Sequence, residues 1–130
     1  MTYKTEKPMV KNQMAFIIRG KENPMNLYYT FHKLAGEDVR RNTVFFILYL
    51  MEEAGFQKEL KAEPISRADF CKRYHVSESS YSRAREDLEK MGIFYPSEEK
   101  LFSTTSNITA NVYVLDLKKA FDEMFNNVEF

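Results

Sequence analysis

The chain has 130 residues, of which 44% are hydrophobic and 29% charged, a composition typical of a folded globular protein rather than a disordered one. Its length is that of one domain, because two full cores would be hard to build from so few residues. The 19 basic and 19 acidic residues cancel. This balance counts against strong non-specific binding to nucleic acids, since proteins that neutralise phosphates usually carry a basic excess.

The same inventory argues against other classes of protein. Cys71 is the single cysteine, so it forms no disulfide within the chain and favours a reducing compartment. The N-terminus lacks the apolar stretch of a signal peptide. The longest apolar run, residues 44–51, is much shorter than the roughly 20 residues that span a bilayer. We therefore expect a cytoplasmic protein without a membrane partner.

The charges are spread unevenly along the chain. Basic residues outnumber acidic ones in residues 1–41, and acidic residues outnumber basic ones in residues 92–130. Such a distribution suits a protein that presents one face to an anion. Chance variation on a solvated surface accounts for it equally well.

The segment 1–37 is expected to form an N-terminal extension. Residues 1–13 are polar and charged, as in a mobile arm. The apolar run 14–18 is followed by a turn sequence containing Asn-Pro and then by the β-prone run 27–31. This order predicts a β-hairpin, although residues 27–34 also suit a short helix.

A long helix is predicted over residues 38–54. Asp38 can cap its start, and Gly55 lies where a residue in the left-handed conformation commonly ends a helix. The run 44–51 is apolar on every side. Most of the circumference of this helix should therefore be buried at the centre of the core.

Two helices joined by a very short turn are predicted in the middle of the chain. Ser66 is a good N-cap for the first helix, and Asp69 stands three positions later as an acidic variant of the capping box. Ser77 can cap the second helix, which covers residues 78–91 and ends at Gly92.

The second of these helices has two faces when its residues are placed at about 100° intervals. The face expected to pack inward carries Tyr81, Ala84, Leu88 and Met91. The opposite face carries Ser79, Ser82, Arg83, Glu86 and Lys90. Small hydroxyl side chains let a helix approach the major groove of DNA, and arginine can pair bidentately with guanine. Glu86 can accept from a cytosine amino group, but we expect it to pair with Arg83 or Lys90.

After Gly92 the pattern predicts a short strand at 93–95, a polar span at 96–110 and an alternating strand at 111–117. Over residues 40–117 the sequence resembles the winged helix-turn-helix family. The resemblance is carried by Ser66-Arg67-Ala68-Asp69-Phe70, by Val76-Ser77 with Ser80, Arg83 and Leu88, by Leu88-Glu89-Lys90-Met91-Gly92-Ile93, and by Val112-Tyr113-Val114-Leu115.

The resemblance implies a mainly α fold with a small β-hairpin wing (α+β). The N-terminal extension departs from the commonest regulators of this family, and the spacing of apolar residues predicts a C-terminal amphipathic helix after the domain. The domain would cover residues 38–117, and residues 118–130 would form the terminal helix. The helix 78–91 would be the recognition helix, and the wing would contact flanking phosphates. The residues expected at the DNA are Ser66, Arg67, Ser77, Ser79, Ser80, Ser82, Arg83, Glu86, Lys90, Lys100, Thr104 and Thr105.

The predicted wing and the C-terminal helix each leave two alternatives open. The wing carries one cation, Lys100, so a solvated hairpin tip is as good an interpretation as a phosphate contact. The C-terminal helix has apolar residues at i, i+4, i+7 and i+8, namely Leu117, Phe121, Met124 and Phe125. These residues can pack on their own domain or form a homodimer, and the apolar chain end slightly favours the dimer.

The sequence shows no pattern of a catalytic, metal or cofactor site. Cys71 and His75 stand at i and i+4, but zinc needs three or four ligands and only His32 remains as another strong candidate. A Cys/His nucleophile pair lacks an orienting group. No glycine-rich phosphate loop occurs. We therefore expect neither an enzyme nor a cofactor.

The leading hypothesis is a small protein that binds duplex DNA, either a transcriptional regulator or an accessory factor of a mobile element in replication or transfer. The Lys-, Asn-, Phe- and Ile-rich composition hints at a low-GC bacterial, plasmid or phage origin. The zero net charge favours an alternative, a protein-interaction module in a replication or transfer complex. A third possibility is a single-stranded DNA binder whose bases stack on Tyr28, Tyr29, Phe31 or Tyr95.

Overall fold

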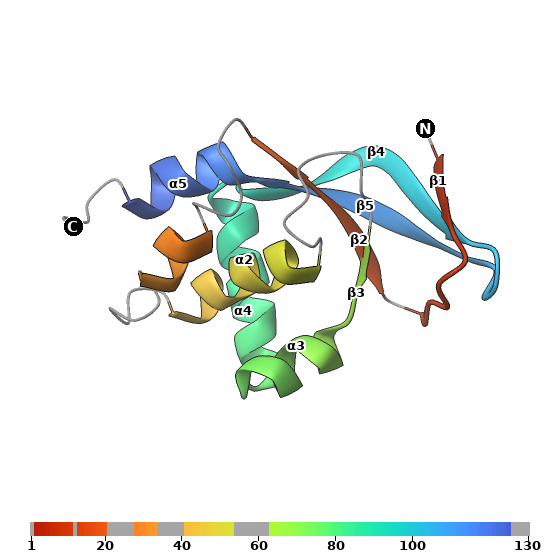
Figure 1. Cartoon of the computed structure of the whole chain (residues 1–130), viewed down its shortest axis with the longest axis horizontal. Coiled ribbons are helices and arrows are strands. Elements are labelled where there is room, and N and C mark those ends of the chain that lie inside the picture. Colours follow the sequence, from red (N-terminus) through yellow and green to blue (C-terminus); the bar gives the residue numbers. More distant parts are fainter. Residues whose placement is uncertain (1, 12, 21–27, 34–40, 54–62, 126–130) are drawn as a thin grey trace.

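The structure, a computed structural model, describes residues 2–11, 13–20, 28–33, 41–53 and 63–125. Within these ranges the helices gather around one end of a long curved sheet, whose far end is a hairpin tip (Figure 1). Residues 28–33 are helical. The other elements are, in chain order, β1 (Thr2–Thr5), β2 (Met14–Arg19), α2 (Arg41–Glu53), β3 (Glu63–Ile65), α3 (Arg67–Tyr74), α4 (Glu78–Lys90), β4 (Phe94–Ser103), β5 (Ile108–Asp116) and α5 (Leu117–Phe125).

The described strands form one mixed sheet in the order β1-β4-β5-β2-β3. β4 and β5 pair antiparallel at its centre, from Phe94 opposite Leu115 to Ser103 opposite Ile108. β1 lies parallel to β4, β2 lies parallel to β5, and β3 pairs antiparallel with β2. The two N-terminal strands therefore flank the hairpin on its two sides.

This sheet contradicts the expected fold, a mainly α domain with a small β-hairpin wing. The hairpin is not a wing on a helical core, because it forms the centre of a five-stranded sheet. The polar span 96–110, expected to be the wing, largely belongs to β4 and β5, and Leu101 and Ala110 within it are buried. The pairing register shifts between Pro96 and Lys100. Such a shift disrupts the simple alternation by which a strand is recognised.

The expectations for the N-terminal segment were also wrong in part. Residues 2–5 are not a mobile arm but the strand β1, paired with β4. The expected hairpin between residues 14–18 and 27–31 does not form, because the described part of the second run is helical and the partners of β2 are β5 and β3. The short-helix alternative is the one found at 28–33. The physical reason is that β2 lies inside the sheet: its side chains are buried on both faces, as in parallel strands, and its backbone pairs with β5 at one edge and β3 at the other.

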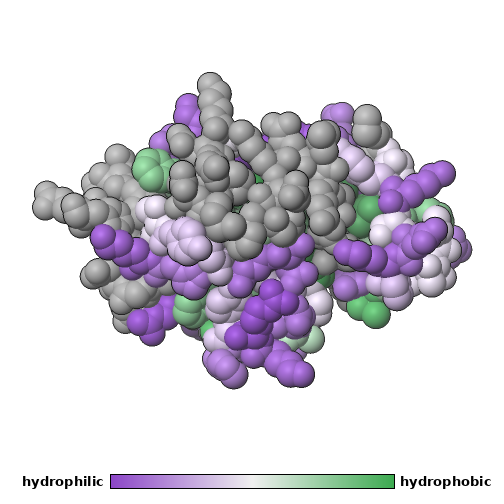
Figure 2. Space-filling model, viewed as in Figure 1, coloured by the Kyte–Doolittle hydropathy of each residue, from purple (hydrophilic) through white to green (hydrophobic). Residues whose placement is uncertain are grey.

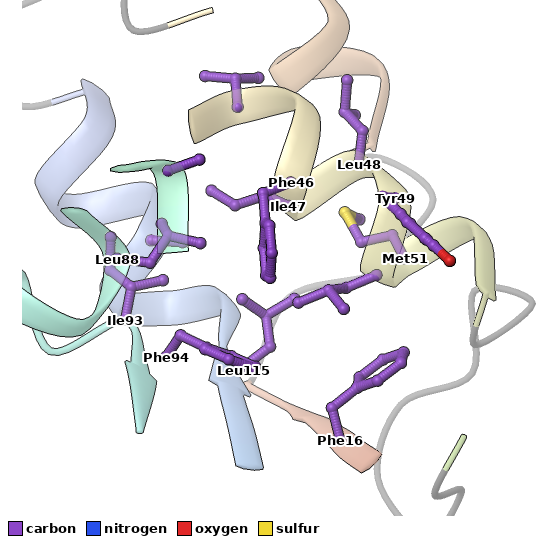
Figure 3. Packing of buried hydrophobic residues seen from close by; sticks show 14 of the residues in the cluster. Phe16, Phe46, Ile47, Leu48, Tyr49, Met51, Leu88, Ile93, Phe94 and Leu115 are labelled. Carbon is purple, nitrogen blue, oxygen red and sulfur yellow. The ribbon is translucent and has the colours of Figure 1, made fainter. Parts of the chain in front are cut away.

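The main core lies where the helices meet the sheet. As predicted, α2 is buried around most of its circumference, with Thr43, Val44 and all residues from Phe46 to Met51 buried. Figure 3 shows Phe46 of α2 among Leu88, Ile93, Phe94 and Leu115, the residues that join α4 to the sheet. The opposite face of the sheet carries a smaller cluster made of Met9, Ala15, Ile17, Leu101, Ala110 and Val112.

The two middle helices begin and end almost where the sequence predicts. The Ser66 Oγ accepts a hydrogen bond of 3.3 Å from the Asp69 N–H, and the Ser77 Oγ accepts one of 3.2 Å from the Ser80 N–H. The turn between the helices starts at His75, which is left-handed with φ 56°. Gly92 follows α4 with φ +72°, a conformation that glycine adopts without steric cost. Both predicted caps are therefore confirmed.

Candidate nucleic-acid interface

The outer face of α4 is the surface that the sequence predicted as exposed. Tyr81, Ala84 and Leu88 are buried against the core, and Met91 beyond the helix end is half-buried. The outward side chains are all exposed: Ser79, Ser82, Arg83, Glu86 and Lys90. The two helical faces derived from the spacing are therefore confirmed.

The expected ion pairs of Glu86 are absent from the part of the chain that the structure describes. Glu86 bridges to neither Arg83 nor Lys90 there, and the ion pair on α4 joins Arg85 and Glu89 at 2.9 Å. The physical reason is anchoring. Arg85 also donates to the Tyr113 hydroxyl at 2.9 Å and its guanidinium lies 5.1 Å from the centre of that ring. A fixed guanidinium loses little entropy on pairing, whereas two fully solvated chains gain little by pairing.

The serines of this region fall into two groups. The hydroxyls of Ser79 and Ser80 each lie 3.0 Å from that of Ser77, which caps α4. These three hydroxyls therefore hydrogen-bond to one another at the start of the helix. The Ser82 hydroxyl is exposed and makes no hydrogen bond to any other described residue. Ser82 is therefore the outer-face serine whose hydroxyl is most available for an external partner.

A first groove, here called the turn-side groove, separates α4 from the connection between β1 and β2. One wall consists of residues 10, 11 and 13, and the other of the start of α3 and one side of α4. In Figure 2 the surface is hollowed between the lower part, formed by α3 and α4, and the part on the right that contains this connection. The lining residues are Val10, Lys11, Gln13, Ile65, Ser66, Arg67, Ala68, Glu78, Tyr81, Ser82, Arg85, Glu86 and Glu89.

A second groove, here called the α2-side groove, lies on the other side of α4. It is lined by the start of α2 and by α4 residues that do not line the turn-side groove. These residues are Arg41, Asn42, Thr43, Ser80, Arg83, Ala84 and Asp87. The carboxylate of Asp87 accepts a hydrogen bond of 3.1 Å from the Thr43 hydroxyl. The groove therefore combines two arginines with one carboxylate that already has a partner.

The hairpin tip is not brought together with α4, although three candidate residues were assigned to it. The Thr104 hydroxyl donates to the Thr5 carbonyl at 3.3 Å, and the Thr105 hydroxyl donates to the Glu6 carbonyl at 2.6 Å. The Lys100 ammonium donates to the Asn111 side chain. Figure 1 shows the tip at the end of the sheet farthest from the helices. These hydroxyls hold the N-terminal segment against the tip.

Sequence reasoning missed Lys11 and Arg41, which line the two grooves opposite α4. Both are exposed. Lys11 belongs to a segment expected to be a mobile arm, and only its position across from α4 brings it to the site. The uneven charge distribution, with basic residues in excess over residues 1–41, was the available signal.

Hydrogen bonds between α2 and α3 hold α3 in place, while α4 packs directly against α2 in the core. The Tyr49 hydroxyl donates to Asp69, and the Tyr74 hydroxyl donates to Glu52. Burial, reinforced by these carboxylates, raises the pKa of both tyrosines far above the ordinary value of 10. Arg73 adds hydrogen bonds to Asp69 and to Glu53. The two helices are thus docked by polar contacts as well as by the core.

Comparison with known proteins gives no lead. No protein-family model, curated protein or solved structure matches the chain. The exposed face of α4 and its two grooves are therefore the observations that bear on function.

The remaining sequence features do not assemble into a site with chemistry of its own. Burial raises the pKa of the half-buried Cys71 thiol, and His75 ends α3 as an exposed residue. Within the described ranges, no three His, Cys, Asp or Glu side chains gather in a way that holds a metal ion. None of the described helices has both the length and the apolar character needed to cross a bilayer.

The homodimer expected from the C-terminal helix stays a prediction. Phe121 on α5 is 40% exposed, while Leu117 and Ala120 of the same helix are buried against the chain's own core. The side chains of Met124 and Phe125 lie outside the described part of the structure.

Proposed function

We propose that this chain binds duplex DNA by inserting the outer face of α4 into the major groove. The observation that supports the proposal is the exposed set of small hydroxyls on α4, with charges that form no ion pair to another described residue, flanked on each side by a groove. An α-helix with its side chains is about 10–12 Å across, and the major groove is about 12 Å wide. A capped helix that stands between two grooves is therefore shaped for this insertion.

Different side chains of α4 are proposed to contact bases and phosphates. Arg83 has the geometry for two hydrogen bonds to guanine, and Glu86 accepts from a cytosine amino group. Ser79 and Ser82 are small enough to let the helix approach the bases. Lys90, near the end of the helix, pairs with a phosphate. Each of these residues is exposed on the same face.

The balanced charge of the chain bears on what kind of DNA-binding protein this is. A protein with 19 basic and 19 acidic residues gains little from counterion release at random sites. Its binding must then depend on base contacts at a preferred sequence. This supports a role as a sequence-specific regulator of transcription, or as an accessory factor that marks a site for replication or transfer.

The surface offers less support for a protein partner or for single-stranded DNA. Among the described residues, the exposed large apolar side chains are Val10, Tyr29, Tyr95 and Phe121, which stand on four separate segments. Each of these segments therefore contributes one such side chain. Of the four aromatics considered for base stacking, Phe31 is buried and Tyr28 is half-buried with a hydrogen bond to Glu52.

The first test is fluorescence anisotropy with a pool of random-sequence duplexes and the matching single strands, at several salt concentrations. We expect duplex binding whose log K falls linearly with log salt, by about 0.9 per phosphate contacted. Selection from the pool should then enrich a defined sequence. A single-strand preference, or a selection at low salt that enriches no duplex sequence, would overturn the proposal.

A matched pair of charge reversals tests whether α4 is the binding surface. Arg83→Glu on α4 and Lys118→Glu on α5 change the net charge equally, and both residues are exposed. We expect the α4 variant to lose binding to the selected duplex and the α5 variant to keep most of it. Equal loss in both variants would show that only the overall charge matters.

A further inference from the structure

Two hydrogen bonds hold α4 at the two borders of its buried face. In the first, here called the sheet anchor, the Arg85 guanidinium donates to the Tyr113 hydroxyl of β5 at 2.9 Å. In the second, the α2 anchor, the Asp87 carboxylate accepts from the Thr43 hydroxyl of α2 at 3.1 Å. With 3.6 residues per turn, the two α4 side chains lie about 160° apart around the helix. The buried side chains of α4 fall within this arc: Tyr81, Ala84 and Leu88.

The sheet anchor continues into the core. The Arg85 Nε also donates to Glu89 at 2.9 Å, and the guanidinium lies 5.1 Å from the centre of the Tyr113 ring. That ring stacks on the buried Phe94, with 4.8 Å between the ring centres. Phe94 in turn meets Phe46 of α2 edge-on at 5.5 Å. The position of Arg85 is therefore set by groups that are fixed in the folded chain.

The α2 anchor also starts from a fixed residue. Thr43 is 4% exposed and lies near the start of α2. Figure 3 shows Phe46 of α2 and Leu88 of α4 in the same core. The helix α4 is therefore tied to the sheet at one border of its buried face and to α2 at the other.

The anchors limit a motion that apolar packing alone does not limit well. Burial is non-directional, so it determines which face of α4 lies inside but opposes a small rotation about the helix axis only weakly. Side-chain ends lie about 5–6 Å from the axis of a helix, so a rotation of about 20° moves them by about 2 Å. A hydrogen bond to a base does not survive such a shift, because its length varies by only about 0.5 Å.

We propose that the two anchors are positioning contacts, which fix the rotation of α4 and thereby direct Arg83 and Glu86 at the bases. This inference rests on the proposed function. It gives the two arginines of the helix different roles. Arg83 contacts DNA, whereas Arg85 contacts the chain's own sheet and acts on DNA only through the orientation of α4.

The test removes each anchor from outside α4. Tyr113→Phe and Thr43→Val delete one hydroxyl each and leave the sequence and charge of α4 unchanged. Each variant should bind the selected duplex about tenfold more weakly, because binding must restore an orientation that a hydrogen bond to a charged group had held. Discrimination against single base-pair variants should fall with it. The slope of log K against log salt should stay the same, since no phosphate contact is lost.

Tyr95→Phe is the matched control. It deletes the hydroxyl of an exposed tyrosine on β4, the strand that pairs with β5, and should change neither affinity nor discrimination. Thermal unfolding of each variant checks that its fold is intact.

Variants of Arg85 distinguish positioning from a direct contact with DNA. Arg85→Lys lacks the planar fork that reaches Glu89 and Tyr113 together, so it should lose discrimination as Arg85→Ala does. Neither variant should change the salt slope. If Arg85 instead pairs with a phosphate, Arg85→Ala will reduce the slope by about 0.9 while Arg85→Lys and Tyr113→Phe keep full binding. That result would overturn the inference.

Hydrogen–deuterium exchange of the free chain provides a readout that does not depend on DNA. The amides of α4 should exchange faster in Tyr113→Phe and in Thr43→Val than in Tyr95→Phe, because the loss of an anchor makes local opening easier.

The outcomes separate this inference from the proposed function. If selection enriches no duplex sequence, the proposed function fails and the aiming of α4 at bases fails with it, while faster exchange still shows that the anchors hold the helix. If the chain binds its selected duplex and both anchor variants keep affinity and discrimination, the positioning role is wrong while the role of α4 stands. Weaker discrimination at an unchanged salt slope, with an unaffected Tyr95 control, supports the inference.

Discussion

The Tyr49 hydroxyl of α2 donates a hydrogen bond of 2.8 Å to the Asp69 carboxylate of α3. The same carboxylate accepts from Arg73 at 2.9 Å, and the Arg73 guanidinium lies 4.7 Å from the centre of the Tyr49 ring. Asp69 also provides the N–H that Ser66 caps. This pair therefore joins the start of α3 to α2, the helix that is buried around most of its circumference.

Tyr49→Phe should lower the free energy of unfolding by about 1–2 kcal/mol, because a hydrogen bond to a charged acceptor is lost while the ring packing remains. Urea denaturation measures this change. Tyr95→Phe is the matched control, since the Tyr95 side chain is exposed on β4 and its loss of a hydroxyl should leave stability unchanged. Equal stability of both variants would mean that the bond to Asp69 contributes nothing net.

Stability should fall as the pH rises above about 10. The pKa values of Tyr49 and Tyr74 are raised in the folded chain, mainly by burial. Above the unfolded pKa the unfolded state has lost these protons while the folded state still binds them. Folding then requires uptake of protons, so the free energy of unfolding falls as the pH rises. Each such tyrosine lowers the free energy of unfolding by about 1.4 kcal/mol per pH unit. Urea denaturation from pH 8 to 11 should show a shallower decline in Tyr49→Phe.

Ser77→Ala should destabilise the chain by about 1 kcal/mol, because the Ser80 N–H loses its capping acceptor at the start of α4. Ser82→Ala is the control on the same helix, since its exposed hydroxyl makes no hydrogen bond to another described residue. If Ser82 faces the bases, DNA binding should depend more on Ser82→Ala than on Ser77→Ala, the reverse of their order for stability. The Ser82 variant should then bind the selected duplex more weakly at unchanged melting temperature. No effect of Ser77→Ala on unfolding would contradict the capping role.

Arg83→Ala should weaken binding to the selected duplex by about 1–3 kcal/mol if Arg83 pairs bidentately with guanine. Arg83→Lys keeps the charge but not the planar fork, so it should recover salt-dependent binding without recovering discrimination at that base pair. Titrations against the selected duplex and single base-pair variants measure both effects. Unchanged affinity in the alanine variant would show that Arg83 does not contact a base.

Glu86→Gln separates a base contact from phosphate repulsion. If Glu86 accepts from cytosine, the glutamine variant should bind the selected duplex more weakly and shift its preference at one position, because glutamine pairs with adenine. Binding to random duplexes should tighten slightly, since one negative charge is removed from the groove wall. A uniform gain on all sequences would rule out the base contact.

The local structure of the middle of the chain could be predicted because its signals lie close together in the sequence. Ser66 and Ser77 each stand three residues before the N–H that they cap. The inward face of α4 follows from the spacing of Tyr81, Ala84 and Leu88. Caps and helical periodicity are local properties, so a single sequence is enough to show them.

The sheet could not be predicted, because its partners are distant in the sequence. Nothing near Ala15 indicates that it pairs with Val112, or near Tyr3 that it pairs with Leu101. A short apolar run is equally consistent with a hairpin strand and with a strand buried on both faces. The candidate site was predicted only where it lies on α3 and α4. Lys11 could not be included, because its place opposite α4 depends on those long-range pairings.

The same distant pairings have a consequence for how the newly made chain folds. β2 leaves the ribosome well before β5, and five of its six residues are buried in the folded chain. Val112 of β5, which pairs with Ala15 of β2, is synthesised 97 residues later. Closing so long a loop slows folding, while α3 and α4 are joined by a turn of three residues. We therefore expect the helices to assemble first. The apolar β2 segment then remains exposed to aggregation or chaperone capture until β5 has been synthesised.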